Sequence, residues 1–151
     1  MKNDSARLIL LGGLPGSGKS KYLERLRADG WTVFDDFQKK AINNLALFRM
    51  SRHYSELVQA LREDRPSVVA DVRLVTIEYR ADAENTLRTD LPNVVMELRI
   101  FELDQAQCAE NIKNSPDPRD APNRLRILGE FAPKHSIPQG ALRLPVWRPR
   151  L

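Results

Sequence analysis

The chain has 151 residues, of which 42% are hydrophobic and 29% are charged, which suits one globular domain and excludes a disordered or low-complexity protein. Its 24 basic and 20 acidic side chains leave a net charge of +4. This mild excess suits an anionic ligand or simply solubility, and it lacks the dense basic stripe typical of DNA-binding proteins.

No apolar stretch is long enough to cross a bilayer. The first apolar stretch follows Asp4 and leads into a glycine-rich loop, so we interpret it as a buried strand and not as a signal peptide. The single cysteine, Cys108, excludes an intrachain disulfide and a cysteine-built metal site. We therefore expect a cytoplasmic protein with no membrane partner.

The N-terminal third alternates strand and helix patterns, which is typical of an α/β fold. A strand is expected over 7–11, where continuous apolar character suits a parallel strand covered on both faces. A loop over 12–18 and a helix over 18–28 follow. A short second strand is expected over 31–34, after a turn.

The next segment, 37–65, has no Gly or Pro, and its two apolar faces at helical spacing predict two consecutive helices. The later predicted elements are strand 67–70, helix 75–90, strand 94–103, helix 105–114, helix 123–131 and strand 141–147. Three prolines within 115–122 argue against regular structure there, so we expect an exposed, mobile loop.

Residues 13–20, GLPGSGKS, match the phosphate-loop pattern G-x-x-x-x-G-K-[ST] at every position. Glycines let successive backbone N–H groups converge on an anion, and the following helix adds its positive N-terminal end. Lys19 suits contact with the β- and γ-phosphates, and the Ser20 hydroxyl suits Mg²⁺. A glycine-rich turn that binds nothing is the alternative, which the position between a strand and a helix disfavours. The predicted nucleotide contacts are Gly13, Leu14, Pro15, Gly16, Ser17, Gly18, Lys19, Ser20 and Lys21.

This loop, close to the start of a small chain, resembles that of the P-loop kinases, with the nearest likeness to polynucleotide kinases, gluconate kinases and zeta-toxin-like kinases. Acidic strand ends and an arginine-bearing lid extend the resemblance along the whole chain, although only the phosphate loop is highly specific. The resemblance implies a P-loop NTPase fold with three α/β/α layers and a five-stranded parallel sheet in the order 2-3-1-4-5. It also implies ATP and Mg²⁺ as cofactors and transfer of the γ-phosphoryl group to a hydroxyl.

Two aspartates, Asp35 and Asp36, follow the second predicted strand, where the strand ends of a parallel sheet line a ligand crevice. In the family, an aspartate here resembles the base that activates the acceptor, so both are candidate catalytic residues and Asp36 a candidate acceptor contact. Capping the next helix is the alternative role. Polynucleotide kinases carry an arginine three positions after this aspartate, whereas Gln38 and Lys39 stand here, which argues against a polynucleotide acceptor.

Asp71 ends the predicted strand 67–70 and resembles the acidic Walker B residue, which holds Mg²⁺, usually through water. Arg73 lies two positions later, where family members contact the acceptor. The alternative for Asp71 is a carboxylate that caps the next turn.

The predicted lid, at about 115–126, carries Arg119, Arg124 and Arg126. In the family, a closing lid brings an arginine onto the transferring phosphoryl group and excludes water. We favour Arg119 and Arg124 for this catalytic role, and a solvated run of charge is the alternative.

Three functions remain open. The favoured one is a kinase that acts on a small-molecule or nucleotide-like hydroxyl. A nucleotide-binding module or switch without transfer is the second, because the D-x-x-R arginine is missing and the lid is rich in proline. A polynucleotide end kinase is the third, so nucleic acid is left open as a partner without being favoured. The absence of N-K-x-D and L-S-G-G motifs argues against a GTPase and a transporter ATPase.

Overall fold

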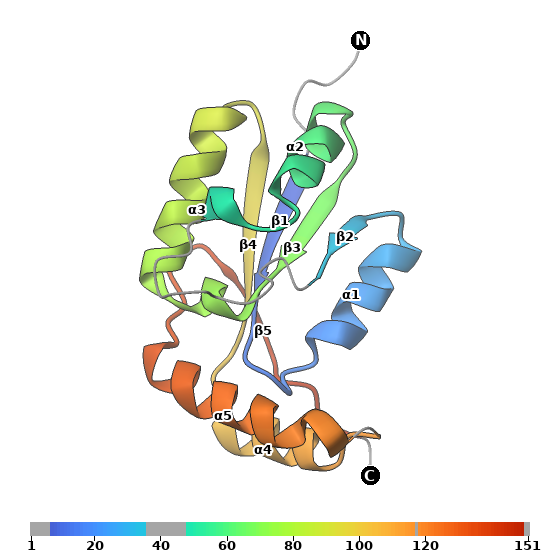
Figure 1. The fold of residues 1–151 in the computed structure, drawn as a ribbon, viewed down its shortest axis with the longest axis vertical. Helices are drawn as coiled ribbons and strands as arrows, with labels where there is room; N and C mark the ends of the chain where they lie inside the picture. The colour runs from blue at the N-terminus through green and yellow to red at the C-terminus, as the bar shows by residue number, and fades with distance from the viewer. Residues whose placement is uncertain (1–6, 36–47, 117, 150–151) are drawn as a thin grey trace.

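The computed structural model describes residues 7–35, 48–116 and 118–149. Its centre is a five-stranded sheet in the order β2-β3-β1-β4-β5 (Figure 1), which confirms the predicted order. Every pairing of neighbouring strands is parallel. The strands are β1 (Arg7–Gly12), β2 (Thr32–Phe34), β3 (Ser67–Ala70), β4 (Val95–Phe101) and β5 (Leu142–Leu144).

Helices cover both faces of the sheet. The α-helices are α1 (Lys19–Ala28), α2 (Tyr54–Arg62), α3 (Ile77–Asp90), α4 (Gln105–Lys113) and α5 (Ala121–Phe131). They are accompanied by the 3₁₀ turns η1 (Phe48–Met50), η2 (Val72–Val75), η3 (Pro118–Asp120) and η4 (Ala132–Lys134). None of the helices in the described part of the chain has the length and apolar character that a bilayer crossing requires.

The central strand explains the three layers. Successive side chains of β1 point to opposite faces, as strand geometry requires. Leu8 and Leu10 pack into a core with α2 and α3, whereas Ile9 and Leu11 pack into a second core with α1. Both faces of β1 are therefore buried, which accounts for its continuous apolar sequence.

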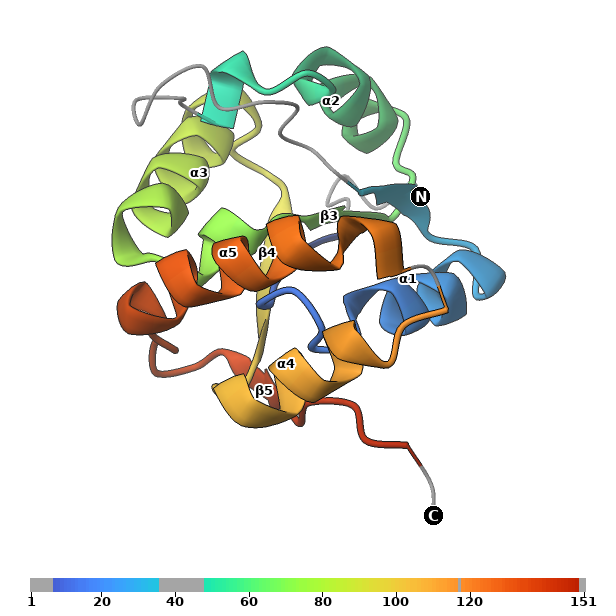
Figure 2. The same cartoon turned by 60° about the horizontal axis from the view of Figure 1, so that its bottom comes forward.

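A third core lies at the end of the sheet where β1 leads into its loop. It joins Cys108 and Ile112 of α4 with Leu128 of α5 and Leu14 of the loop. Figure 2 shows α4 and α5 running side by side across this end of the sheet. Cys108 is fully buried, as its apolar helical face predicts, and burial raises the pKa of its thiol to about 11.

Several predicted boundaries differ from the structure. The expected helix over 75–90 begins at Ile77, because η2 comes first and the Thr76 side chain then caps the helix. The prediction that 115–122 has no regular structure is wrong at its end, where η3 and the first turn of α5 lie. Proline is tolerated in the first turn of a helix, so Pro122 does not prevent α5 from beginning at Ala121.

Two other predicted segments correspond to the structure only in part. The expected last strand over 141–147 is shorter, because β5 pairs with β4 along three residues only. Of the two helices expected within 37–65, the second corresponds to α2, and most of the first lies outside the described residues.

Candidate active site

The loop between β1 and α1 lies at the lower end of the sheet in Figure 1, beside α4 and α5. Gly16 has φ +83° and Gly18 has φ +108°, which are conformations that other residues adopt only at a cost. The first N–H groups of a helix have no partner within it. Gly18, the cap residue of α1, has no side chain that could accept them. The loop and helix end therefore offer backbone donors to an anion.

Close packing also requires the three motif glycines. A Cβ atom on Gly13 would lie 2.7 Å from Ser17 Oγ, and one on Gly18 would lie 2.7 Å from the Cβ of Trp147. On Gly16 it would collide with the carbonyl oxygen of Cys108. Other parts of the chain thus hold the loop on several sides.

The buried hydroxyl of Ser17 indicates that the loop fits a phosphate. Ser17 is 1% exposed, and within the described residues its Oγ has no hydrogen-bond partner. An unpartnered buried hydroxyl is costly unless a ligand or water completes it. Because Ser17 Oγ lies directly beside Gly13 in the loop, a phosphate oxygen at this position is a suitable partner. The residues present therefore fit a bound phosphate group.

The predicted loop contacts are not equivalent. The side chain of Leu14 is buried in the core with α4 and α5, and Pro15 has no N–H group. Lys19 is half-buried in the first turn of α1, whereas the side chains of Ser20 and Lys21 are exposed. Lys21 Nζ lies 4.5 Å from the centre of the Trp147 ring.

Asp71 and Arg73 form a buried ion pair at the end of β3. Arg73 donates from Nε to Asp71 Oδ1 at 3.1 Å and from Nη2 to Oδ2 at 2.8 Å. The side chains are 3% and 11% exposed for Asp71 and Arg73 respectively. Asp71 Oδ1 also accepts from the Arg73 backbone N–H at 2.9 Å, so the predicted capping role is present. The two residues that the sequence assigns to metal and acceptor are thus partners of each other.

Tyr79 completes this cluster from α3. Its ring lies 4.0 Å from the Arg73 guanidinium carbon, and its hydroxyl accepts from Arg73 Nη2 at 2.8 Å. Burial, followed by the negative charge of Asp71, raises the pKa of Tyr79 well above its ordinary value. The tyrosine therefore stays neutral and supports the guanidinium as a stacking surface. The cluster adjoins β1, because the Asp71 N–H donates to the carbonyl oxygen of Leu11 at 3.2 Å.

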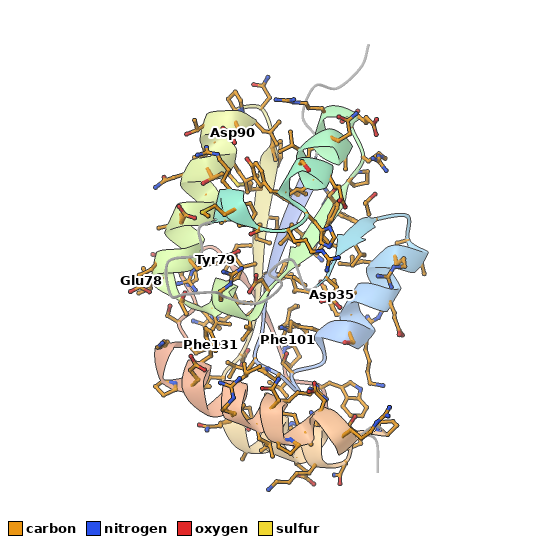
Figure 3. All side chains as sticks on the ribbon, in the orientation of Figure 1. Asp35, Glu78, Tyr79, Asp90, Phe101 and Phe131 are labelled. Atoms are coloured by element: carbon orange, nitrogen blue, oxygen red, sulfur yellow. The ribbon has the colours of Figure 1, made fainter. Side chains whose placement is uncertain are left out.

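Of the two candidate bases, the structure describes only Asp35. Asp35 is exposed directly after β2, and Figure 3 shows it at the same end of the sheet as Phe101 of β4. The phosphate loop lies at this same end of the sheet (Figure 1). Asp36 lies outside the described residues.

The candidate lid residues lie in η3 and α5. Arg119 is exposed in η3, and Arg124 is half-buried near the start of α5. Arg126 donates to Asn123 Oδ1 at 2.8 Å and to Glu130 Oε2 at 3.4 Å, along the exposed side of its own helix. For Arg126 this arrangement matches the alternative of a solvated charge run.

Sequence reasoning missed Arg80. It is 6% exposed and donates from Nη1 to the carbonyl oxygens of Leu74 at 3.0 Å and Ser136 at 2.9 Å. Burial lowers the pKa of this arginine. Arg80 therefore ties the turn that carries Arg73 to the segment that follows α5 and η4. No local pattern reveals such a link, because Arg80 and Ser136 are 56 positions apart.

Comparison with known proteins finds a likeness to solved structures and none at the level of sequence families. No family model matches the sequence, and no curated protein matches it. A gluconokinase from Sinorhizobium meliloti 1021 has a TM-score of 0.63 at 16% identity, over 99% of this chain and 86% of that chain. A fungal RNA kinase has a TM-score of 0.64 at 10% identity, over 98% and 79%. A chain of the Pnkp1/Rnl/Hen1 RNA repair complex has a TM-score of 0.57 at 14% identity, over 91% and 50%. At these identities the likeness concerns the fold, and it extends over nearly the whole chain.

Proposed function

We propose that this chain, which has the fold of the P-loop kinases, transfers the γ-phosphoryl group of ATP to a hydroxyl of a small-molecule or nucleotide-like acceptor. The observation that carries the proposal is the loop between β1 and α1. It combines the complete GLPGSGKS sequence, two glycines at positive φ, and the buried, unpartnered hydroxyl of Ser17. Each of these features favours binding of a polyphosphate.

Each residue of the site has a proposed task. The loop amides bind the phosphates, and Lys19 places a positive charge beside the β- and γ-phosphates. Mg²⁺, when bound, neutralises part of the phosphate charge, and Ser20 and Asp71 are the residues that would hold it. Asp35 or Asp36 accepts the proton of the acceptor hydroxyl at a carboxylate oxygen.

The lid adds two further tasks. Arg119 and Arg124 compensate the negative charge that develops on the transferring group. Closure of η3 and the start of α5 over the loop excludes water, which limits wasteful hydrolysis of ATP.

The Asp71–Arg73 ion pair bears on how the site is completed. Asp71 accepts hydrogen bonds from Arg73 at both carboxylate oxygens, so a metal held by Asp71, directly or through water, competes with the guanidinium for them. A guanidinium that the metal displaces can contact the phosphoryl acceptor, which is the role that the sequence predicts for Arg73. The same ion pair favours the second candidate function, a nucleotide-binding switch without transfer, if Mg²⁺ never displaces the Arg73 guanidinium from Asp71.

The proposal is tested by a screen of hydroxyl-bearing metabolites, nucleosides and oligonucleotide ends for ATP-dependent phosphorylation. A kinase shows ATP turnover that rises sharply with the right acceptor. Turnover that stays low with every acceptor, together with tight ATP binding, indicates the switch. Phosphorylation of oligonucleotide ends alone identifies the third candidate, the polynucleotide end kinase.

Replacement of the two candidate bases gives the first prediction. We expect one of Asp35→Asn and Asp36→Asn to slow transfer by ~10²–10⁴-fold, because an amide cannot take the proton of the acceptor. ATP affinity should change by less than about twofold, because neither carboxylate contributes to the phosphate loop. Steady-state kinetics and calorimetric titration with ATP separate the two effects.

The matched control is Asp29→Asn, which makes the same change at the exposed turn after α1 and should leave both quantities unaltered. If the double variant of Asp35 and Asp36 still transfers at the wild-type rate, the assigned base is wrong.

A further inference from the structure

We infer that Asn111 of α4 is a positioning residue for the phosphate loop, although it belongs to no motif of the sequence. The inference rests on the proposed function, because it concerns the geometry in which the loop receives phosphates. Asn111 acts together with Gln107 of the same helix and with Trp147 of the segment after β5. We call these three residues the loop clamp.

The amide nitrogen of Asn111 bridges two chain segments. Its Nδ2 donates to the carbonyl oxygen of Gly16 at 2.9 Å and to that of Trp147 at 2.8 Å. The backbone N–H of Trp147 donates in turn to the carbonyl oxygen of Ser17 at 2.9 Å. Two consecutive carbonyl groups of the loop are thereby held, one by α4 and one by the segment after β5.

These contacts decide where the loop amides point. In a trans peptide, the C=O of one residue and the N–H of the next point in opposite directions. Holding the Ser17 carbonyl toward Trp147 turns the Gly18 N–H to the opposite side. Holding the Gly16 carbonyl toward α4 turns the Ser17 N–H inward, where it donates to Leu14 O at 3.1 Å. The clamp therefore fixes the orientation of peptide groups that would otherwise rotate easily at glycine.

A second set of contacts orients the Asn111 amide itself. Asn111 Oδ1 accepts from Gln107 Nε2 at 2.9 Å, which leaves the amide nitrogen facing the two carbonyls. Gln107 Oε1 accepts from Arg148 at 3.0 Å, and Arg148 also donates to Asp104 at 2.6 Å. The chain of bonds thus runs from the residue after Trp147, through α4, to the loop.

Close packing reinforces the hydrogen bonds. Gly16 lies against Cys108 and Ile112 of α4, and Gly18 lies against the Cβ of Trp147. Consequently α4 is part of the fixed wall of the loop. The predicted lid at 115–126 follows this wall directly along the chain.

The test uses Trp147 as a reporter. Trp31 is the only other tryptophan, so a Trp31→Phe parent isolates the emission of Trp147. Trp147 is 40% exposed. In that parent we compare Asn111→Asp and Asn111→Ala. Asp keeps the shape but turns an acceptor toward two carbonyl oxygens, whereas Ala removes both hydrogen bonds without adding charge.

We expect both Asn111 variants to bind ATP–Mg²⁺ about tenfold or more weakly, as the loss of one partly buried and one exposed hydrogen bond to the loop and to Trp147 implies. We also expect Trp147 emission of the ligand-free protein to shift to longer wavelength, because the indole is released toward water. The matched control is Asn85→Asp, the same change at an exposed position of α3, and it should alter neither quantity.

The two readouts separate a positioning role from other outcomes. Unchanged ATP affinity in folded Asn111 variants overturns the inference, including the case in which only their melting temperature falls. If the Asn111 variants do not fold, the Gln107→Ala variant is the test. It keeps both bonds from Asn111 to the carbonyl oxygens, removes the bond that orients the amide together with the bond to Arg148, and should weaken ATP binding about threefold. If the parent itself binds no ATP, the proposed function fails instead, while an emission shift in ligand-free Asn111→Ala still supports the clamp and an unchanged emission overturns it.

Discussion

The Lys19→Met variant should retain its fold and lose phosphoryl transfer by on the order of 10³-fold, the loss that follows removal of one preorganised charge partner of a transition state. Lys19 lies half-buried in the first turn of α1, directly after Gly18, so its amino group can follow the phosphates as charge moves between them. Methionine keeps a similar length and helix propensity, so the change removes charge with little effect on α1.

The measurement is kcat/KM for the acceptor found in the screen, together with the melting temperature. Lys113→Met is the matched control, because Lys113 is exposed at the end of α4 and should tolerate the same change without effect. Transfer by Lys19→Met within about tenfold of the wild type would remove Lys19 from the catalytic role.

Gly16→Ala should damage both the stability of the protein and its ATP binding. A Cβ at this position meets the carbonyl oxygen of Cys108, and the residue also has φ +83°. We expect the free energy of unfolding to fall by about 2–4 kcal/mol, the sum of left-handed strain and overpacking. ATP affinity should fall by more than about 100-fold, because the loop moves away from α4 and its amides no longer converge.

The Gly30→Ala variant separates the effect of left-handed backbone strain from the effect of overpacking. Gly30 has φ +95°, but among the described residues nothing other than its chain neighbours lies within 4 Å of the Cβ position. This variant should lose only about 1–2 kcal/mol through strain, with ATP affinity unchanged. Chemical denaturation and calorimetric titration of both variants measure these differences. Equal losses of stability in the two variants would contradict the packing of Gly16 on α4.

The parts of the fold that the sequence predicted well are those with a local cause. The strand at 67–70 matches its predicted bounds, and α1 ends where predicted and begins one residue later, because buried strands and amphipathic helices have distinct apolar patterns. The position of the glycine-rich loop between β1 and α1 was predicted for the same reason, since its pattern lies in eight consecutive residues. The start of α5 was missed, because the proline that interrupts most helices is tolerated in a first turn.

The parts of the site that the sequence did not reveal depend on distant contacts. Asn111 and Gly16 are 95 positions apart, and neither residue type indicates the other. Asp71 and Arg73 were both singled out, but their mutual ion pair depends on the turn η2 and on the ring of Tyr79 beneath the guanidinium. Side-chain partners of this kind follow from the packing of α3 and α4 around the loop, which composition and periodicity do not encode.

The central claim is that the loop between β1 and α1 binds the phosphates of ATP. Calorimetric titration of the wild-type chain with ATP, with and without Mg²⁺, tests it most directly. We expect saturable binding of one nucleotide per chain that is strengthened by Mg²⁺ and competed by pyrophosphate. A folded wild-type chain that releases or absorbs no heat with ATP–Mg²⁺, and whose melting temperature is unchanged by it, would contradict the account.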